Sequence, residues 1–204
     1  MTGQDDLSWP RPRRHSRARA VDVLLRLGAD LTLRDKRHST PLHLASARGE
    51  TESMELLIQH GADVTVRDRR RSTPLHLASY RGMTDSMELL IQHGADVNAR
   101  DKSHSTPLHK ASRSSHVDPI RVLIQHGADV NARNKSNSTP LHVALFWPIS
   151  EIVRLLLEHG ANADTENDMG RSSYDIALST SGCTFHEISQ LFLDHHNRAR
   201  EREQ

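Results

Sequence analysis

Residues 40–72 read TPLHLASARGETESMELLIQHGADVTVRDRRRS, and this stretch recurs along the chain. The tetrapeptide TPLH begins at four threonines spaced 33 residues apart: Thr40, Thr73, Thr106 and Thr139. A second marker, GAD or GAN, begins at five glycines with the same spacing: Gly28, Gly61, Gly94, Gly127 and Gly160. A fixed period of this length, with no insertion or deletion, predicts a solenoid in which each unit buries its apolar face against its neighbours.

Within one unit, the residues predict two helices and a polar extension. Thr40 can cap the first helix by accepting a backbone N–H, and Pro41 suits the first helical position. Gly49 tolerates the positive φ that often ends a helix. Apolar residues at helical spacing then predict a second helix that runs to about His60. The following segment, GADVTVRDRRRS, is polar; we call it and its equivalents the fingers.

The repeats resemble a known family. TPLHLA, TPLHLA, TPLHKA and TPLHVA, each followed at a fixed distance by GAD or GAN, look like ankyrin repeats over residues 18–196. The resemblance implies an all-α repeat solenoid of ankyrin-type helix-turn-helix units with extended finger loops. It also implies that the histidine of each motif forms hydrogen bonds within and between units. These motif histidines are His43, His76, His109 and His142.

One departure from the family pattern lies at the end of each finger. Ankyrin repeats usually carry glycine two residues before the capping threonine, but only Gly170 keeps it here. The other units hold His38, Arg71, His104 and Asn137. Side chains other than glycine and asparagine adopt positive φ less readily. We therefore expect these finger tips to be strained or differently turned.

The repeat register divides the chain into three segments. We expect a disordered basic leader at 1–17, an ankyrin repeat domain at 18–196 and a charged tail at 197–204. The domain would contain a half repeat (18–39), full repeats (40–72, 73–105, 106–138 and 139–171) and a C-terminal cap (172–196). Either Leu7 and Trp9 fold back over the half repeat, or the chain is a truncated form of a longer array. The arginine-rich leader fits an import or anion-binding arm as well as a solvated tail.

Composition restricts the class of protein. Aromatic residues make up only 3% of the chain, which suits a stack of short helices, and the formal net charge is +1. A single cysteine, Cys183, excludes an internal disulfide. No apolar run approaches the length of a membrane span, and the N-terminus has no apolar segment typical of a secretory signal. We therefore expect a monomeric cytoplasmic or nuclear protein.

Fifteen histidines suggest a metal site, but the repeat accounts for most of them. A second set lies near the end of each unit's second helix: His60, His93, His126 and His159. Equivalent residues of packed helices are roughly 10 Å apart, whereas two ligands of one zinc lie within about 4 Å of each other. Cys183 has His186 nearby but no third group to orient a base. We expect no cofactor, no metal, no small-molecule substrate and no enzymatic activity.

The fingers carry a ladder of cations. One repeat position holds Arg34, Arg67, Arg100 and Arg133; the position two residues on holds Lys36, Arg69, Lys102 and Lys135. Such an electropositive edge attracts an acidic partner. The alternative is that the intervening aspartates, Asp35, Asp68 and Asp101, pair locally with the arginines and leave a solvated edge.

A second candidate surface lies at the ends of the first helices. Tyr80, Arg113 and Phe146 share one repeat position, and Arg81 and Trp147 share the next. In ankyrin-like proteins these positions and the finger tips line a concave groove. Tyrosine, arginine and tryptophan are enriched in binding hot spots. The alternative is that Phe146 and Trp147 pack on the degenerate last unit.

The sequence therefore predicts a non-catalytic protein–protein interaction module, an adaptor or scaffold. It would bind a partner protein, acidic where it meets the fingers, through the concave groove and the basic finger loops. The alternative is an anion-binding module that contacts nucleic acid or an acidic membrane surface through the basic finger edge. Binding that falls steeply with salt for any polyanion would indicate the alternative.

Overall fold

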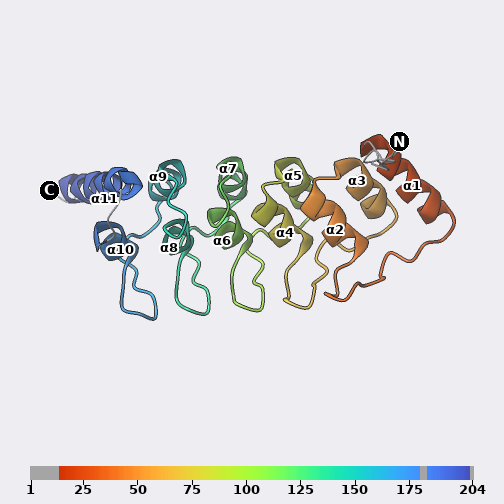
Figure 1. Cartoon of the computed structure of the whole chain (residues 1–204), viewed down its shortest axis with the longest axis horizontal. Helices are drawn as coiled ribbons and strands as arrows, with labels where there is room; N and C mark the ends of the chain where they lie inside the picture. Colours follow the sequence, from red (N-terminus) through yellow and green to blue (C-terminus); the bar gives the residue numbers. More distant parts are fainter. Residues whose placement is uncertain (1–13, 180–182, 203–204) are drawn as a thin grey trace, which may run out of the picture.

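The computed structural model describes the backbone of residues 14–179 and 183–202, and the side chains of residues 17–179 and 186–197. Its helices form two parallel rows, with the fingers projecting from one side (Figure 1). The row nearer the fingers contains α2 (Pro41–Arg48), α4 (Pro74–Arg81), α6 (Pro107–Ser112), α8 (Pro140–Ala144) and α10 (Ser173–Ser179). The outer row contains α1 (Arg14–Arg26), α3 (Thr51–Gln59), α5 (Thr84–Gln92), α7 (Asp118–Gln125), α9 (Ser150–Glu158) and α11 (Cys183–Arg202). The all-α solenoid predicted from the repeats is confirmed.

Each inner helix of the four TPLH units begins with the same set of hydrogen bonds. In the second unit, the Thr73 N–H donates to Nδ1 of His76 at 3.1 Å. The tautomer with an acceptor at Nδ1 carries its proton on Nε2, which donates at 3.0 Å to the carbonyl of Ser105, the last residue before the next unit begins at Thr106. The other motif histidines repeat both contacts. The expected bonding within units is confirmed, and it holds the end of each finger where the following unit begins.

The core is a row of small apolar layers. The leucines of the TPLH motifs are at most 1% exposed: Leu42, Leu75, Leu108 and Leu141. Outer helices contribute a methionine or β-branched residue and a leucine at helical spacing, such as Met87 and Leu90 on α5, both fully buried. Consecutive inner helices pack on one another, as α2 on α4 and α4 on α6. Every layer is therefore shared between neighbouring units, which is the defining property of a solenoid.

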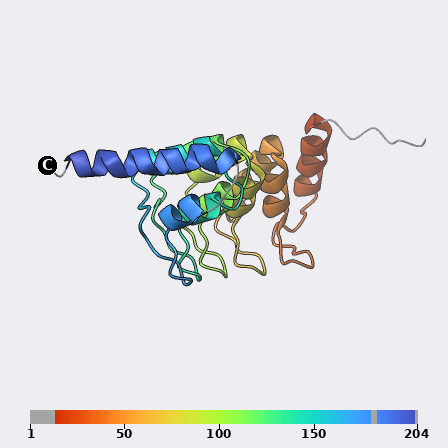
Figure 2. The same ribbon diagram turned by 60° about the vertical axis from the view of Figure 1, so that its left-hand side comes forward.

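The two ends of the array differ from the predicted boundaries. α1 begins at Arg14, so residues 14–17 are helical and were wrongly included in a disordered leader. α11 runs to Arg202 and past the last unit, through most of the segment predicted as a tail (Figure 2). Leu24, whose equivalent Leu57 is buried, is 56% exposed because no described inner helix covers it. Leu7 and Trp9, which would cover it under one of the two alternatives, lie outside the described residues.

Shared layers predict that central truncations destabilise more than terminal ones. Leu108→Ala should lower the free energy of unfolding by about 2–5 kcal/mol, because the cavity opens between two units. Tyr174 is half-buried on α10, with its ring edge-on to Phe192 at 6.3 Å between centroids. Tyr174→Ala should therefore cost less and mainly fray the end. Urea unfolding of both variants checks this, and equal losses would contradict a one-dimensional stack.

The buried histidines predict an acid-sensitive fold. Burial lowers the pKa of His76 and of His109 to about 4, from an ordinary value of 6.5. Between these values the unfolded chain binds protons that the folded chain does not, so stability should fall as the pH drops from 6.5 towards 4. The slope should be about 1.4 kcal/mol per pH unit for each of the two. Above about pH 6.5 this contribution should be constant.

Urea unfolding between about pH 5 and pH 8 measures that slope while the carboxylates stay ionised. His76→Gln should be less stable at every pH but should show a shallower slope, because one titrating group has been removed. His93→Gln is the matched control, because this histidine is exposed and contacts only the Leu89 carbonyl of its own helix. An unchanged slope in His76→Gln would show that other groups cause the pH dependence.

Candidate binding surface

The fingers are held side by side by their own backbones. The Arg69 N–H donates to the Arg37 carbonyl at 2.9 Å, and the Lys102 N–H to the Arg70 carbonyl at 2.7 Å. The Lys135 N–H continues the series at 2.9 Å from the Ser103 carbonyl. These bonds cross from one unit to the next near the finger ends. The fingers therefore form one continuous edge, and the side chains on it have fixed backbones beneath them.

The finger aspartates do not neutralise the finger arginines. Oδ1 of Asp68 accepts from the backbone N–H groups of Arg70 and Ser72, each at 2.8 Å. Asp35 does the same in its own finger, where hydrogen bonding by the Ser39 amide is the largest cause of its lowered pKa. Over residues 17–179 and 186–197, no ion pair joins a finger aspartate to a finger arginine. Direct Arg–Asp ion pairs, the alternative considered from the sequence, are therefore not formed in this part of the chain, although the charge of Arg37 contributes to the lowered pKa of Asp35.

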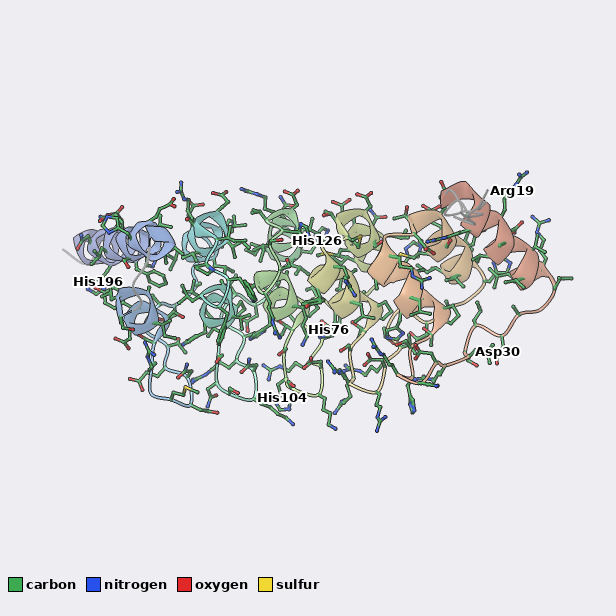
Figure 3. All side chains as sticks on the ribbon, viewed as in Figure 1. Arg19, Asp30, His76, His104, His126 and His196 are labelled. Carbon is green, nitrogen blue, oxygen red and sulfur yellow. The ribbon has the colours of Figure 1, made fainter. Side chains whose placement is uncertain are left out.

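The finger ends keep the turn that glycine would allow. The residues in the glycine position have φ of 60° at His38, 59° at Arg71, 57° at His104 and 53° at Asn137, against 65° at Gly170. Of the two expectations, a strained tip agrees with these φ values, and a different turn does not. His76 lies in the helical stack, whereas His104 lies at the end of its finger (Figure 3). The four side chains other than hydrogen at this position are exposed, and their positive φ has a conformational cost.

The structure divides the cation ladder into two groups. Three members of the first position donate to the carbonyl one repeat further on: Arg34 to Arg67 O at 2.8 Å, Arg67 to Arg100 O at 2.6 Å, and Arg133 to Glu166 O at 2.7 Å. They are interunit staples, a role that the sequence pattern did not reveal. The second position is exposed and has no side-chain hydrogen bond or ion pair to a described residue: Lys36, Arg69, Lys102 and Lys135.

Lys110 forms an ion pair at a position where the repeat otherwise has an apolar residue. A lysine at such a position commonly extends its ammonium to solvent. Instead Nζ lies 2.6 Å from Oδ2 of Asp101, whose side chain is 5% exposed. Burial alone would raise the pKa of Asp101, but the hydrogen bond and charge of Lys110 lower it below its ordinary value. The pair joins α6 to the finger that precedes it in the chain, at residues 94–105.

The aromatic residues at the inner-helix ends are exposed. Tyr80 is 46%, Phe146 76% and Trp147 64% exposed, so the idea that Phe146 and Trp147 pack on the last unit is wrong. The Arg81 guanidinium lies 5.9 Å from the centroid of the Tyr80 ring. Arg113 and Trp147 line one open hollow of about 460 Å³, together with Ser115, Pro148 and Ile149. The structure thus brings the five predicted residues together in two pairs, Tyr80–Arg81 and Arg113–Trp147, with Phe146 beside the second.

The histidines, Cys183 and the apolar helices were the other candidates for a site or a membrane segment. In the described part of the chain, no group of three or more histidine, cysteine, aspartate or glutamate side chains is arranged to hold a metal ion. The outer-helix histidines each contact a carbonyl of their own helix, as His60 Nδ1 does with the Leu56 carbonyl at 2.9 Å. None of the described helices combines the length and apolarity needed to cross a membrane. The Cys183 side chain lies outside the described residues.

Comparison with known proteins agrees with this geometry. A family model described as ankyrin repeats (3 copies) matches residues 14–101 and 98–167, which is more than half of the chain. The chain belongs to the ankyrin repeat family. Ankyrin repeat domains generally mediate protein–protein interactions and are typically non-catalytic. No curated protein matches this ankyrin repeat chain significantly.

The strained tip of the finger at residues 61–72 predicts a stabilising substitution. Arg71→Gly removes a side chain held at a φ of 59° and should raise the free energy of unfolding by about 0.5–1 kcal/mol. Arg70→Gly is the matched control, because it removes the same charge next door, where no positive φ is found. It should be neutral or destabilising. Urea unfolding at about 0.5 M salt, which screens the charge difference, checks both; a loss of stability in Arg71→Gly would contradict the strain.

Proposed function

We propose that this ankyrin repeat protein is a non-catalytic interaction module that binds a partner protein across its inner-helix ends and fingers. We call this the recognition face: Tyr80, Arg81, Arg113, Phe146 and Trp147 with the finger cations. Its place of action would be the cytoplasm or nucleus, as the composition suggests. The family supports protein binding in general; the residues of this chain support the particular face.

The exposure of the aromatic side chains carries the proposal. A ring that is about half exposed or more contributes little to the stability of the stack, and sister units have Ala47 and Arg113 where Tyr80 and Phe146 stand. The repeat therefore does not require a ring at this position. Exposed aromatic and arginine side chains close together are the composition of binding hot spots. The hollow between Arg113 and Trp147 offers a place where an apolar side chain of a partner can be partly buried.

One observation favours the second candidate function, anion binding. The exposed finger cations have no carboxylate partners among the described residues, so the edge is electropositive. A nucleic acid or an acidic membrane surface would be attracted to it as an acidic protein would. The two functions separate by salt: polyanion binding should fall steeply with salt whatever the sequence. Binding anchored by Trp147 should persist at high salt, because burial of apolar area is not screened.

The proposed function predicts that the rings bind rather than stabilise. Trp147→Ala and Tyr80→Ala should each weaken partner binding by more than about 1 kcal/mol, roughly fivefold. Their melting temperatures should change little because both rings are exposed. The partner is first captured from native extract by crosslinking to the wild-type chain, and each variant is then titrated against it. Leu27→Ala is the control, because Leu27 is as exposed as these rings but lies at the end of α1.

Two results would overturn this assignment. If Trp147→Ala unfolds the C-terminal half while the remaining folded protein binds normally, Trp147 is a packing residue. If Leu27→Ala weakens binding as much as Trp147→Ala, the loss reflects general surface apolarity and not this face.

A further inference from the structure

Arg100 breaks the pattern of the interunit staples. Its three register equivalents, Arg34, Arg67 and Arg133, each donate to the carbonyl 33 residues further along. By the same register Arg100 would donate to the Arg133 carbonyl. No hydrogen bond or ion pair joins the Arg100 guanidinium to any described residue. Arg100 is exposed, as Arg34 and Arg133 are, so the missing bond and not its exposure distinguishes it from them.

The backbone that carries Arg100 is nevertheless fixed from both sides. The Arg100 carbonyl accepts the staple from Arg67 at 2.6 Å. The next residues of the same finger are tied to both neighbours, by the Lys102 N–H to the Arg70 carbonyl and by the Lys135 N–H to the Ser103 carbonyl. Arg100 is therefore a free guanidinium on an ordered backbone. Less freedom is lost when such a group binds a ligand.

The carboxylate next to Arg100 is not available to neutralise it. Asp101 is buried, lies 2.6 Å from Nζ of Lys110 and accepts the amides of Ser103 and Ser105 through its other oxygen. In the other TPLH units, the position of Lys110 holds Leu44, Leu77 and Val143. Only the third unit thus supplies a lysine that occupies the finger aspartate. The positive charge of Arg100 stays uncompensated at the junction of finger and inner helix.

The charges of the fingers indicate what Arg100 binds. The ends of the first four fingers carry eleven lysines and arginines and three aspartates, counted over residues 34–38, 67–71, 100–104 and 133–137. The end of the fifth finger, at residues 166–170, carries Glu166 and Asp168 and no lysine or arginine. A long polyanion would run onto the acidic fifth finger, but a short acidic segment fits the first four. Lys110 and Arg113 are less than one helical turn apart on α6 and its C-terminal cap. An extended segment of about five residues can therefore reach from Arg100 to the Arg113–Trp147 hollow.

We propose that Arg100 is the specificity-determining residue that binds a carboxylate in an acidic segment of the partner protein, while its three register equivalents only hold the fingers together. This rests on the proposed function, since it assigns the partner's chemistry at the same face. The planar guanidinium donates two parallel N–H bonds to a carboxylate, which a lysine does not reproduce. Lys102, two residues on, adds charge but no fixed geometry.

The experiment titrates the full chain with fluorescent probes at about 0.15 M salt. The main probe is a peptide of about twelve residues with glutamates at alternate positions and one leucine; its twin has glutamines instead. Arg100→Ala should weaken binding of the glutamate peptide about tenfold, as expected for a lost charge-assisted pair. It should leave binding of the glutamine twin and the melting temperature unchanged. Arg100→Lys should recover only part of the loss.

Arg133→Ala is the matched control. It removes the same charge at the same repeat position, but its guanidinium donates to the Glu166 carbonyl. It should lower the melting temperature and weaken the glutamate peptide by less than about threefold. Equal losses in Arg100→Ala and Arg133→Ala would overturn the assignment, because the effect would then be diffuse charge. A single-stranded DNA of similar length that binds more tightly than the glutamate peptide would also overturn it, in favour of phosphate binding.

The outcome is separable from that of the proposed function. If no variant or probe shows binding of the glutamate peptide, the acidic segment is wrong, while Trp147→Ala still tests the recognition face against the captured partner. If Arg100→Ala weakens the glutamate peptide but Trp147→Ala leaves the captured partner bound, Arg100 stands and the aromatic part of the face fails.

Discussion

The buried histidine of the TPLH motif is the interaction on which the rest of the array depends. Nδ1 of His76 accepts the Thr73 N–H at the start of its own helix, and Nε2 donates to the carbonyl of Ser105, which ends the finger of the same repeat directly before Thr106 of the next unit. One neutral ring therefore caps a helix and fixes the following unit in register. It does so only while uncharged, because burial disfavours the imidazolium. A buried polar group that were not fully bonded here would destabilise the very layer it organises.

The histidine fixes the end of each finger that leads into the next inner helix. The outer part of the finger is ordered by other contacts. The backbone bonds between fingers, such as Lys102 N–H to the Arg70 carbonyl, need no particular side chain. The aspartate at the turn accepts hydrogen bonds from backbone N–H groups of the same finger, as Asp68 does from Arg70 and Ser72. Because these bonds satisfy the backbone, side chains such as Lys102 and Lys135 are not needed to order the fingers. The exposed lysines and arginines of the finger edge are the result.

The sequence was sufficient for the fold because a period of 33 residues constrains every unit at once. Thr73, Pro74 and Gly82 mark the ends of α4, and the structure places them there. The ends of the array were less predictable, since α1 and α11 extend into segments that no repeat constrains. The sequence also did not reveal the interunit bonds of Arg34, Arg67 and Arg133. A hydrogen bond to a backbone carbonyl depends on where the next finger passes, and every residue has a carbonyl, so no residue type indicates the acceptor. For Lys110, the missing information was that Asp101 is buried within reach.

Deviations from the repeat are informative in different ways. Arg71 and His104 deviate from glycine yet keep the turn, so the backbone dictates the conformation and tolerates strain. Phe146 and Trp147 deviate without being buried, so no packing demand explains them.

Lys110 deviates from the repeat by pairing with Asp101 of the preceding finger. Next to this pair, Arg100 occupies the repeat position of the interunit staples but lacks their bond. Lys110 belongs to the third unit and Phe146 and Trp147 to the fourth, and residues of both units line the Arg113–Trp147 hollow. In a repeat protein every unit offers the same scaffold, so recognition of one partner must come from the places where units differ. The third and fourth units are where this chain differs in charge and in exposed apolar area together.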